Sequence, residues 1–202
     1  MKNVKVDEWL DFFRQYKEKK LFSLSDFIQL TGENKSSISV QLSRLVKSGV
    51  VCRAAQVWYE NPFASPTPEE IAMVVRHPSY LSMEYTLSKQ GILSQAVYTI
   101  TLITTKLPYT YNRNQTVYEY HQVRKPLFWG YKREGTVLTA EPEKALLDLI
   151  YIRYVSTREI SVAELTSLVN DMYIDELDKE TLHSYAERFN PVTRKVLNQL
   201  KI

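Results

Sequence analysis

Residues 22–59, FSLSDFIQLTGENKSSISVQLSRLVKSGVVCRAAQVWY, hold two short amphipathic segments, a polar turn between them and a β-rich end. Ser23 or Ser25 can cap the first segment, and Gly32 suits the position past a helix end where φ is positive. Asn34 is a good N-cap for the second segment. The order predicts two helices joined by a tight turn, followed by a pair of strands. The expected apolar side of the first helix is Leu24, Phe27, Ile28 and Leu30.

The second segment has one apolar stripe. Ile38, Leu42 and Leu45 fall at i, i+4 and i+7, which is the spacing of one face of a helix. The opposite side carries small hydroxyls, one valine and cations, with an amide at its border. These residues are Ser36, Ser37, Ser39, Val40, Gln41, Ser43, Arg44 and Lys47, with Lys35 at the helix start.

This outward side suits the major groove of double-stranded DNA. Small side chains let a helix approach closely, hydroxyls and amides reach base edges, and a valine can contact a thymine methyl group. Lys35, Arg44 and Lys47 can neutralise phosphates, which supplies much of the affinity. The sequence therefore predicts a DNA-binding helix-turn-helix. The alternative is that the serine-rich side is a solvated surface of a structural or protein-docking domain.

The end of the stretch predicts a wing. Gly49 ends the second helix, and residues 50–59 predict two strands around Ala54-Ala55, with Arg53 as a further DNA contact. Cys52 is expected to be a small core residue. Three prolines in residues 62–68 predict a linker. The expected organisation is a winged helix-turn-helix in residues 1–61, which begins with a helix at 6–19, and a second domain in residues 69–202.

The second domain is expected to be mixed and to end in helices, so the fold class is α+β. Ser82 is expected to cap a helix that runs to Gly91, and Pro142 to begin another. The predicted strands are residues 96–105, 116–123 and 135–140. The predicted C-terminal helices are residues 162–172, 175–189 and 191–200.

Tyrosines alternate with cations between the predicted strands. One interpretation is a basic loop that forms a second nucleic-acid surface with Arg113, Arg124, Lys125, Lys132 and Arg133. The other is that the tyrosines, which include Tyr118 and Tyr120, pack a sheet face. Charge is distributed unevenly: residues 1–60 carry ten Lys/Arg against seven Asp/Glu, whereas residues 136–202 carry eight against eleven. This asymmetry favours DNA contact at the N-terminal end.

Composition argues against several other classes of protein. One cysteine supports no disulfide framework, and the three histidines, His77, His121 and His183, lack metal-ligand spacing. With five glycines there is no phosphate-cradling loop, and no nucleophile motif is present. We expect no catalytic residues, no metal and no cofactor. The acids within the first apolar run argue against a signal peptide, and no run is long enough to cross a bilayer, so a cytoplasmic protein is expected.

Three segments resemble a known family. HPSYLSMEYTLSKQGIL (77–93), AVYTITLITT (96–105) and TVLTAEPEKALLDLIYIR (136–153) are similar to the AbiEi antitoxins of abortive-infection phage-defence systems, as is YAERFNPVTRKVLNQL (185–200). The matching positions are Ser82, Gly91, Pro142, Glu143, Lys144, Ala145, Leu146, Leu147 and Asp148.

The resemblance implies a transcriptional repressor that binds promoter repeats of its own operon. It also implies a partner, a nucleotidyltransferase-like toxin encoded beside it. Two alternatives stay open: a module that neutralises its partner directly, and a solitary regulator without a toxin. For the Pro-Glu-Lys-Ala run, the residues themselves favour a structural role, in which Asp148 bonds a neighbouring strand or helix end.

Overall fold

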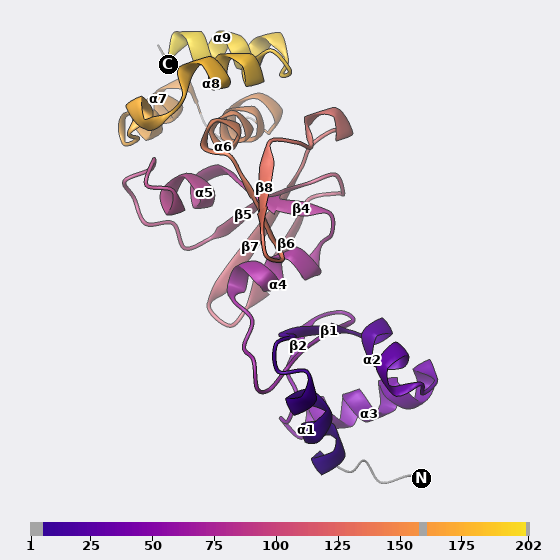
Figure 1. Ribbon diagram of the computed structural model, residues 1–202. Helices are drawn as coiled ribbons and strands as arrows, with labels where there is room; N and C mark the ends of the chain where they lie inside the picture. The colour runs from indigo at the N-terminus through magenta and orange to yellow at the C-terminus, as the bar shows by residue number, and fades with distance from the viewer. Residues whose placement is uncertain (1–5, 158–160, 201–202) are drawn as a thin grey trace. The chain divides into compact units, whose positions relative to one another are not determined.

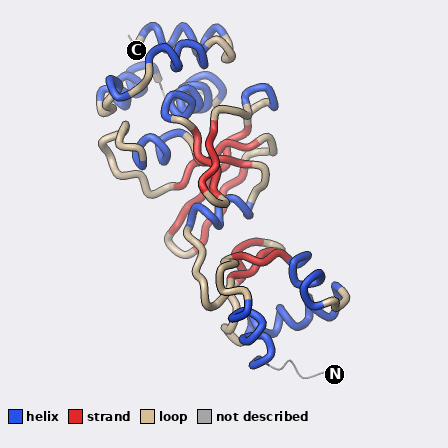
Figure 2. The backbone as a smooth tube through the Cα atoms, in the orientation of Figure 1, coloured by secondary structure: helices blue, strands red, loops and turns tan. Residues whose placement is uncertain are grey.

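The computed structural model describes residues 6–157 and 161–200. Their contacts divide the chain into two compact units, Met1–Val75 and Arg76–Ile202. Each unit has its own sheet with helices against it, as Figures 1 and 2 show. The protein is therefore of the mixed α+β class, as the sequence predicts.

The first unit combines helices with a small three-stranded sheet. The sheet is antiparallel in the order β1-β3-β2. Its elements are α1 (Val6–Gln15), β1 (Leu21–Ser23), α2 (Leu24–Thr31), α3 (Lys35–Lys47), β2 (Arg53–Ala55), β3 (Trp58–Glu60) and α4 (Pro68–Val75).

Local capping fixes the ends of α2 and α3. Ser23 Oγ accepts a hydrogen bond from the Asp26 N–H at 3.1 Å, and Asp26 Oδ2 accepts from the Ser23 N–H at 2.7 Å, so Ser23 and not Ser25 is the cap. Gly32 has φ +69° at the end of α2. The side chain of Asn34 accepts from the Ser37 N–H at 2.9 Å. These capping predictions are confirmed.

An aromatic cluster forms the core of the first unit. Phe22 of β1 and Phe27 of α2 stack with ring centroids 5.1 Å apart. The stripe of α3 packs against the same cluster, since Ile38, Leu42 and Leu45 are all buried. Leu30 is 43% exposed, so its expected place on the apolar side is wrong.

Three further predictions for the first unit are wrong: the end of the first helix, the position of the hairpin turn and the burial of Cys52. The first helix ends at Gln15 and not at residue 19, because Asn61 Nδ2 donates to the carbonyls of Phe13, Tyr16 and Lys19 and closes the turn. Ala54 and Ala55 are buried strand residues, so the hairpin turns at residues 56–57 instead. Cys52 is exposed and does not belong to the core.

Helix α4 follows the proline-rich segment and belongs to the first unit. It contacts β2, and Lys20 Nζ lies 3.0 Å from both carboxylate oxygens of Glu70. The division between the units thus lies after Val75, whereas the prolines predict it at residues 62–68.

A six-stranded mixed sheet in the order β6-β7-β5-β4-β9-β8 organises the second unit. The pairs β5–β7 and β4–β9 are parallel, and the other neighbours are antiparallel. The elements before the C-terminal helices are β4 (Ser79–Leu81), α5 (Met83–Lys89), β5 (Ile100–Thr104), β6 (Tyr109–Arg113), β7 (Thr116–Gln122), η1 (Lys125–Leu127), β8 (Tyr131–Glu134) and β9 (Val137–Ala140).

The C-terminal third of the chain is helical, as the sequence predicts. Figure 1 shows α7, α8 and α9 gathered beside α6 at one end of the second unit. Between α6 and α7 the helix widens into a π-helical segment. The elements are α6 (Pro142–Leu149), η2 (Ile150–Ser156), α7 (Val162–Asn170), η3 (Ile174–Glu176), α8 (Lys179–Ala186) and α9 (Pro191–Gln199).

Two predictions for this unit are wrong in detail. The strand expected at residues 96–105 begins at Ile100. The tyrosine-rich segments expected to form a loop are instead strands β6 and β8. Each finds a partner strand that supplies its backbone hydrogen bonds, β7 for β6 and β9 for β8.

Candidate nucleic-acid interface

Helix α3 presents the outward side that its periodicity predicts. Val40 is 51% exposed at its centre, and the buried stripe faces the aromatic core. Lys35, Ser36, Ser43 and Lys47 are also exposed, whereas Ser37, Ser39, Gln41 and Arg44 are half-buried. The candidate residues therefore divide into an exposed set and a set at the border of the helix.

Gln41 is held in place by three hydrogen bonds. Its Oε1 accepts from Trp9 Nε1 of α1 at 3.0 Å. Its Nε2 donates to Glu33 Oε2 at 2.7 Å and to Ser37 Oγ at 3.1 Å. The amide of Gln41 is thus engaged within the protein and does not point freely to solvent.

Glu33 is a functional candidate that sequence reasoning missed. It is exposed in the turn before α3, and its Oε2 accepts from Ser37 Oγ at 2.6 Å as well as from Gln41. A periodicity analysis does not include Glu33 because it lies outside the helix. Glu33, Ser37 and Gln41 are spaced four residues apart, and this i, i+4 spacing is the sequence signal that predicts contacts of Glu33 with the helix.

Arg53 lies on β2 and is held against the sheet. Its Nη2 donates to Tyr59 Oη at 3.1 Å, and its guanidinium carbon lies 5.4 Å from the centroid of the Tyr59 ring. The tip of the hairpin, where a wing would contact a groove, is formed by Gln56 and Val57, and Val57 is 46% exposed.

The five cations of the expected second basic surface are not gathered in one place. Arg113 ends β6, whereas Lys132 and Arg133 lie on β8 at the opposite edge of the sheet, and Arg124 and Lys125 follow β7. Lys132 Nζ also pairs with Glu141 Oε1 at 2.9 Å, and this hydrogen bond, with one from Tyr185, lowers the pKa of Glu141. Tyr118 and Tyr120 are buried, which supports the packing interpretation of the tyrosines.

The Pro-Glu-Lys-Ala run places a fully buried charge pair inside the second unit. Lys144 forms an ion pair with Asp148 one turn later, and its Nζ donates to Tyr80 Oη at 2.9 Å. Asp148 Oδ2 accepts from Tyr80 Oη at 2.9 Å and from Ser82 Oγ at 2.8 Å. We call these four residues the buried tetrad. Ser82 makes no side-chain cap bond to α5, so its expected capping role is wrong.

Burial dominates the electrostatics of the buried tetrad. It lowers the pKa of Lys144 and raises that of Asp148, while the attraction between the two opposes both shifts. The rings of Trp129 and Phe189 surround the ammonium group, each with its centroid 5.2 Å from Nζ. All four side chains are fully buried, which favours a structural role for the buried tetrad.

A substitution at Gly130 tests how closely the surrounding residues pack against the Lys144 side chain. Gly130 has φ +75°, and an added Cβ would lie 2.8 Å from Cγ of Lys144, whose side chain is fully buried. We expect Gly130→Ala to lower the free energy of unfolding by about 2–4 kcal/mol, from overpacking together with backbone strain. Urea titration followed by circular dichroism measures the loss.

Gly135→Ala is the matched control. Gly135 has φ +60°, but an added Cβ there meets no atom within 4 Å. Only the strain of about 1 kcal/mol is then expected. Equal losses in the two variants would mean that the surroundings of Lys144 relax to accept the methyl group.

Comparison with models of protein families finds no match, and comparison with curated proteins finds none either. Within residues 6–157 and 161–200, no three His, Cys, Asp or Glu side chains converge as a metal site requires. No helix in the described ranges is long and apolar enough to cross a membrane.

Proposed function

We propose that the protein is a sequence-specific DNA-binding repressor, cytoplasmic, whose first unit acts as a winged helix-turn-helix. The observation that carries the proposal is the outward side of α3, where hydroxyls and Val40 lie between Lys35 at one end and Lys47 at the other. Small polar residues at the centre suit base contacts, and cations at the ends suit phosphates. The preceding helix α2 and the hairpin β2–β3 supply the helix and the wing that such a module needs.

The second part of the proposal is that the repressor is the antitoxin of an abortive-infection system and regulates its own operon. It rests on the resemblance of residues 77–93 and 136–153 to AbiEi antitoxins. Lys144 and Asp148, within the most specific part of that resemblance, are buried. We therefore assign this run to the stability of the second unit, and expect a toxin of the nucleotidyltransferase type to contact other residues.

Footprinting on DNA upstream of the gene, at two salt concentrations, tests the repressor. Protection of a repeated sequence, weaker at the higher salt, is the expected result. Uniform or absent protection at both concentrations contradicts it.

Co-expression with the neighbouring gene tests the antitoxin separately. Growth that is arrested by the neighbour alone and restored by this protein supports an antitoxin. DNA protection without such rescue indicates a solitary regulator, and rescue without protection indicates direct neutralisation.

Glu33→Gln is expected to raise the affinity for duplex DNA of any sequence about threefold at low salt, because it removes a negative charge beside the phosphates. The amide oxygen of the new side chain still accepts from Ser37 and Gln41, which keeps α3 in place. Fluorescence anisotropy with a labelled random duplex measures the change. Glu18→Gln, an exposed acid outside the turn and α3, is the control, and an equal gain there would show that only net charge matters.

A further inference from the structure

A cavity of about 470 Å³ lies in the second unit between the sheet and the π-helical segment η2. Thr110 of β6 pairs with Glu119 of β7, so their side chains share the face that forms its floor, with His121 two residues further on. Ile152, Arg153 and Ser156 of η2 line the opposite wall. Its volume is in the range of about 300–1,000 Å³ that is typical of small-molecule sites.

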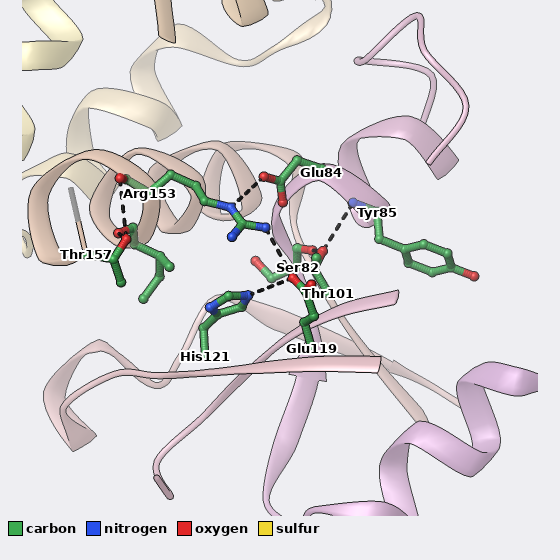
Figure 3. A network of polar contacts seen from close by, with 9 residues as sticks. Ser82, Glu84, Tyr85, Thr101, Glu119, His121, Arg153 and Thr157 are labelled. Carbon is green, nitrogen blue, oxygen red and sulfur yellow. Dashed lines mark hydrogen bonds and ion pairs between the residues drawn. The ribbon is translucent and has the colours of Figure 1, made fainter. Parts of the chain in front are cut away.

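Arg153 and Glu119 both line this cavity, and their side chains point toward one another (Figure 3). Arg153 Nε donates to Glu84 Oε1 at 2.9 Å, and its Nη2 donates to Glu119 Oε2 at 3.4 Å. His121 Nε2 lies 3.5 Å from the same Glu119 oxygen. The π-helical segment brings Arg153 into this position, and π-helical turns occur frequently at functional sites.

A second hollow of about 220 Å³ borders the same pair. It is also lined by Glu119 and Arg153, together with Glu84 and Thr101. The contact between Glu119 and Arg153 is therefore shared by the two spaces. Glu119 is accessible, since 32% of its side chain is exposed.

The charges of Glu84, Glu119 and Arg153 favour a positively charged ligand. Two carboxylates, Glu84 and Glu119, face one guanidinium group. The 3.4 Å contact of Glu119 with Arg153 is long for a charge-assisted hydrogen bond, so Glu119 is incompletely compensated. Oε2 of Glu84 is buried and has no hydrogen-bond partner among the described residues. Glu84 does not line the larger cavity, but its 2.9 Å bond engages the charge of Arg153, so a ligand beside Glu119 in that cavity meets a carboxylate that would repel an anion.

We propose that the larger cavity binds a small organic cation whose protonated amine or guanidinium group donates to Glu119. The ammonium group would add a further donor to Glu119, and the hydroxyl groups of Thr110 and Ser156 line the same cavity and are available to the remainder of the ligand. The site lies within the second unit, whereas α3 belongs to the first, and the proposal does not depend on DNA binding.

Agmatine is a suitable probe, because it carries an ammonium group and a guanidinium group on a short alkyl chain. We expect the full-length protein to bind it saturably in heteronuclear NMR titrations, with shifts at Glu119, His121 and Arg153. Inorganic phosphate, the anionic control, is expected to cause no saturable shift. Glu119→Gln should weaken agmatine binding at least about tenfold, since it removes the charge of the acceptor.

Two further variants keep the test decisive. Ser156→Phe puts a ring at an exposed position of the cavity wall and should abolish binding without altering the charge pair, even if Glu119→Gln fails to fold. Glu134→Gln, an exposed acid on β8, is the matched control and should bind as the unchanged protein does. No saturable binding, binding that both Glu119→Gln and Ser156→Phe leave intact, or phosphate binding at the same residues overturns the proposal.

A blocked peptide with a single lysine distinguishes the sources of the cation. Agmatine binding that exceeds peptide binding assigns the site to a free small molecule. Peptide binding of equal or greater strength assigns it to a lysine side chain of a partner protein, and either result supports the site itself.

Discussion

Replacing Asp148 with alanine is expected to lower the free energy of unfolding by about 3–5 kcal/mol, because it leaves Lys144 buried without its counter-charge. The loss also includes the hydrogen bonds from Tyr80 and Ser82, whose hydroxyls then lie buried with no carboxylate to accept them. Urea-induced unfolding followed by circular dichroism measures the effect.

The double variant Lys144→Met with Asp148→Asn is the matched control. It removes both charges but keeps an amide oxygen that can accept from Tyr80 and Ser82. Apolar replacement of a buried ion pair is often neutral or stabilising, so we expect a loss of less than about 2 kcal/mol. If the single variant costs no more than the double, Lys144 reaches water through an opening, and its burial is not permanent.

The second large effect is expected at the ends of α3. Lys35→Ala combined with Lys47→Ala should weaken binding to every duplex sequence at least about tenfold and reduce the salt slope by about two, because two phosphate contacts are lost. Both lysines are exposed and lie outside the core, so the fold is expected to persist. Anisotropy titrations over a series of salt concentrations give both quantities.

Variants at the centre of α3 should behave differently. Val40→Ala and Ser43→Ala, at exposed positions, are expected to change the preferred sequence and to leave the salt slope unchanged. Ser36, Ser37 and Gln41 are less suitable for this test, because Asn34, Glu33 and Trp9 engage them. Lys195→Ala, an exposed lysine of α9, is the control for net charge. An unchanged slope in the Lys35 and Lys47 variant would show that α3 does not contact phosphates.

Much of the first unit is predictable from local sequence. The caps Asn34 and Gly32 act on their own neighbours, and the stripe of α3 repeats within thirteen residues. β1 was not predicted because it has three residues, too few to show alternation, and it becomes a strand by pairing with β3. The position of the hairpin turn likewise depends on which residues of β2 the core buries.

The candidate sites also differ in whether local sequence predicts them. The outward residues of α3 follow from helical geometry, and the first turn of the run from Pro142 to Leu149 predicts the helix that the structure has there. The cavity beside Arg153 was not predicted, because Glu84, Glu119 and Arg153 are separated by at least thirty-four residues along the chain. The sheet and η2 bring them together.

By itself, the sequence determined the class of fold, the caps of α2 and α3 and the side of α3 that faces outward, because each depends on residues within a few turns of one another. Tertiary structure decided the rest. It directs the Ser82 hydroxyl to Asp148 and not to a helix end, places Arg113 and the two cations of β8 at opposite edges of the sheet, and brings Glu119 next to Arg153. The physical reason is that hydrogen bonds and ion pairs between distant segments form only when packing of the core has fixed their positions.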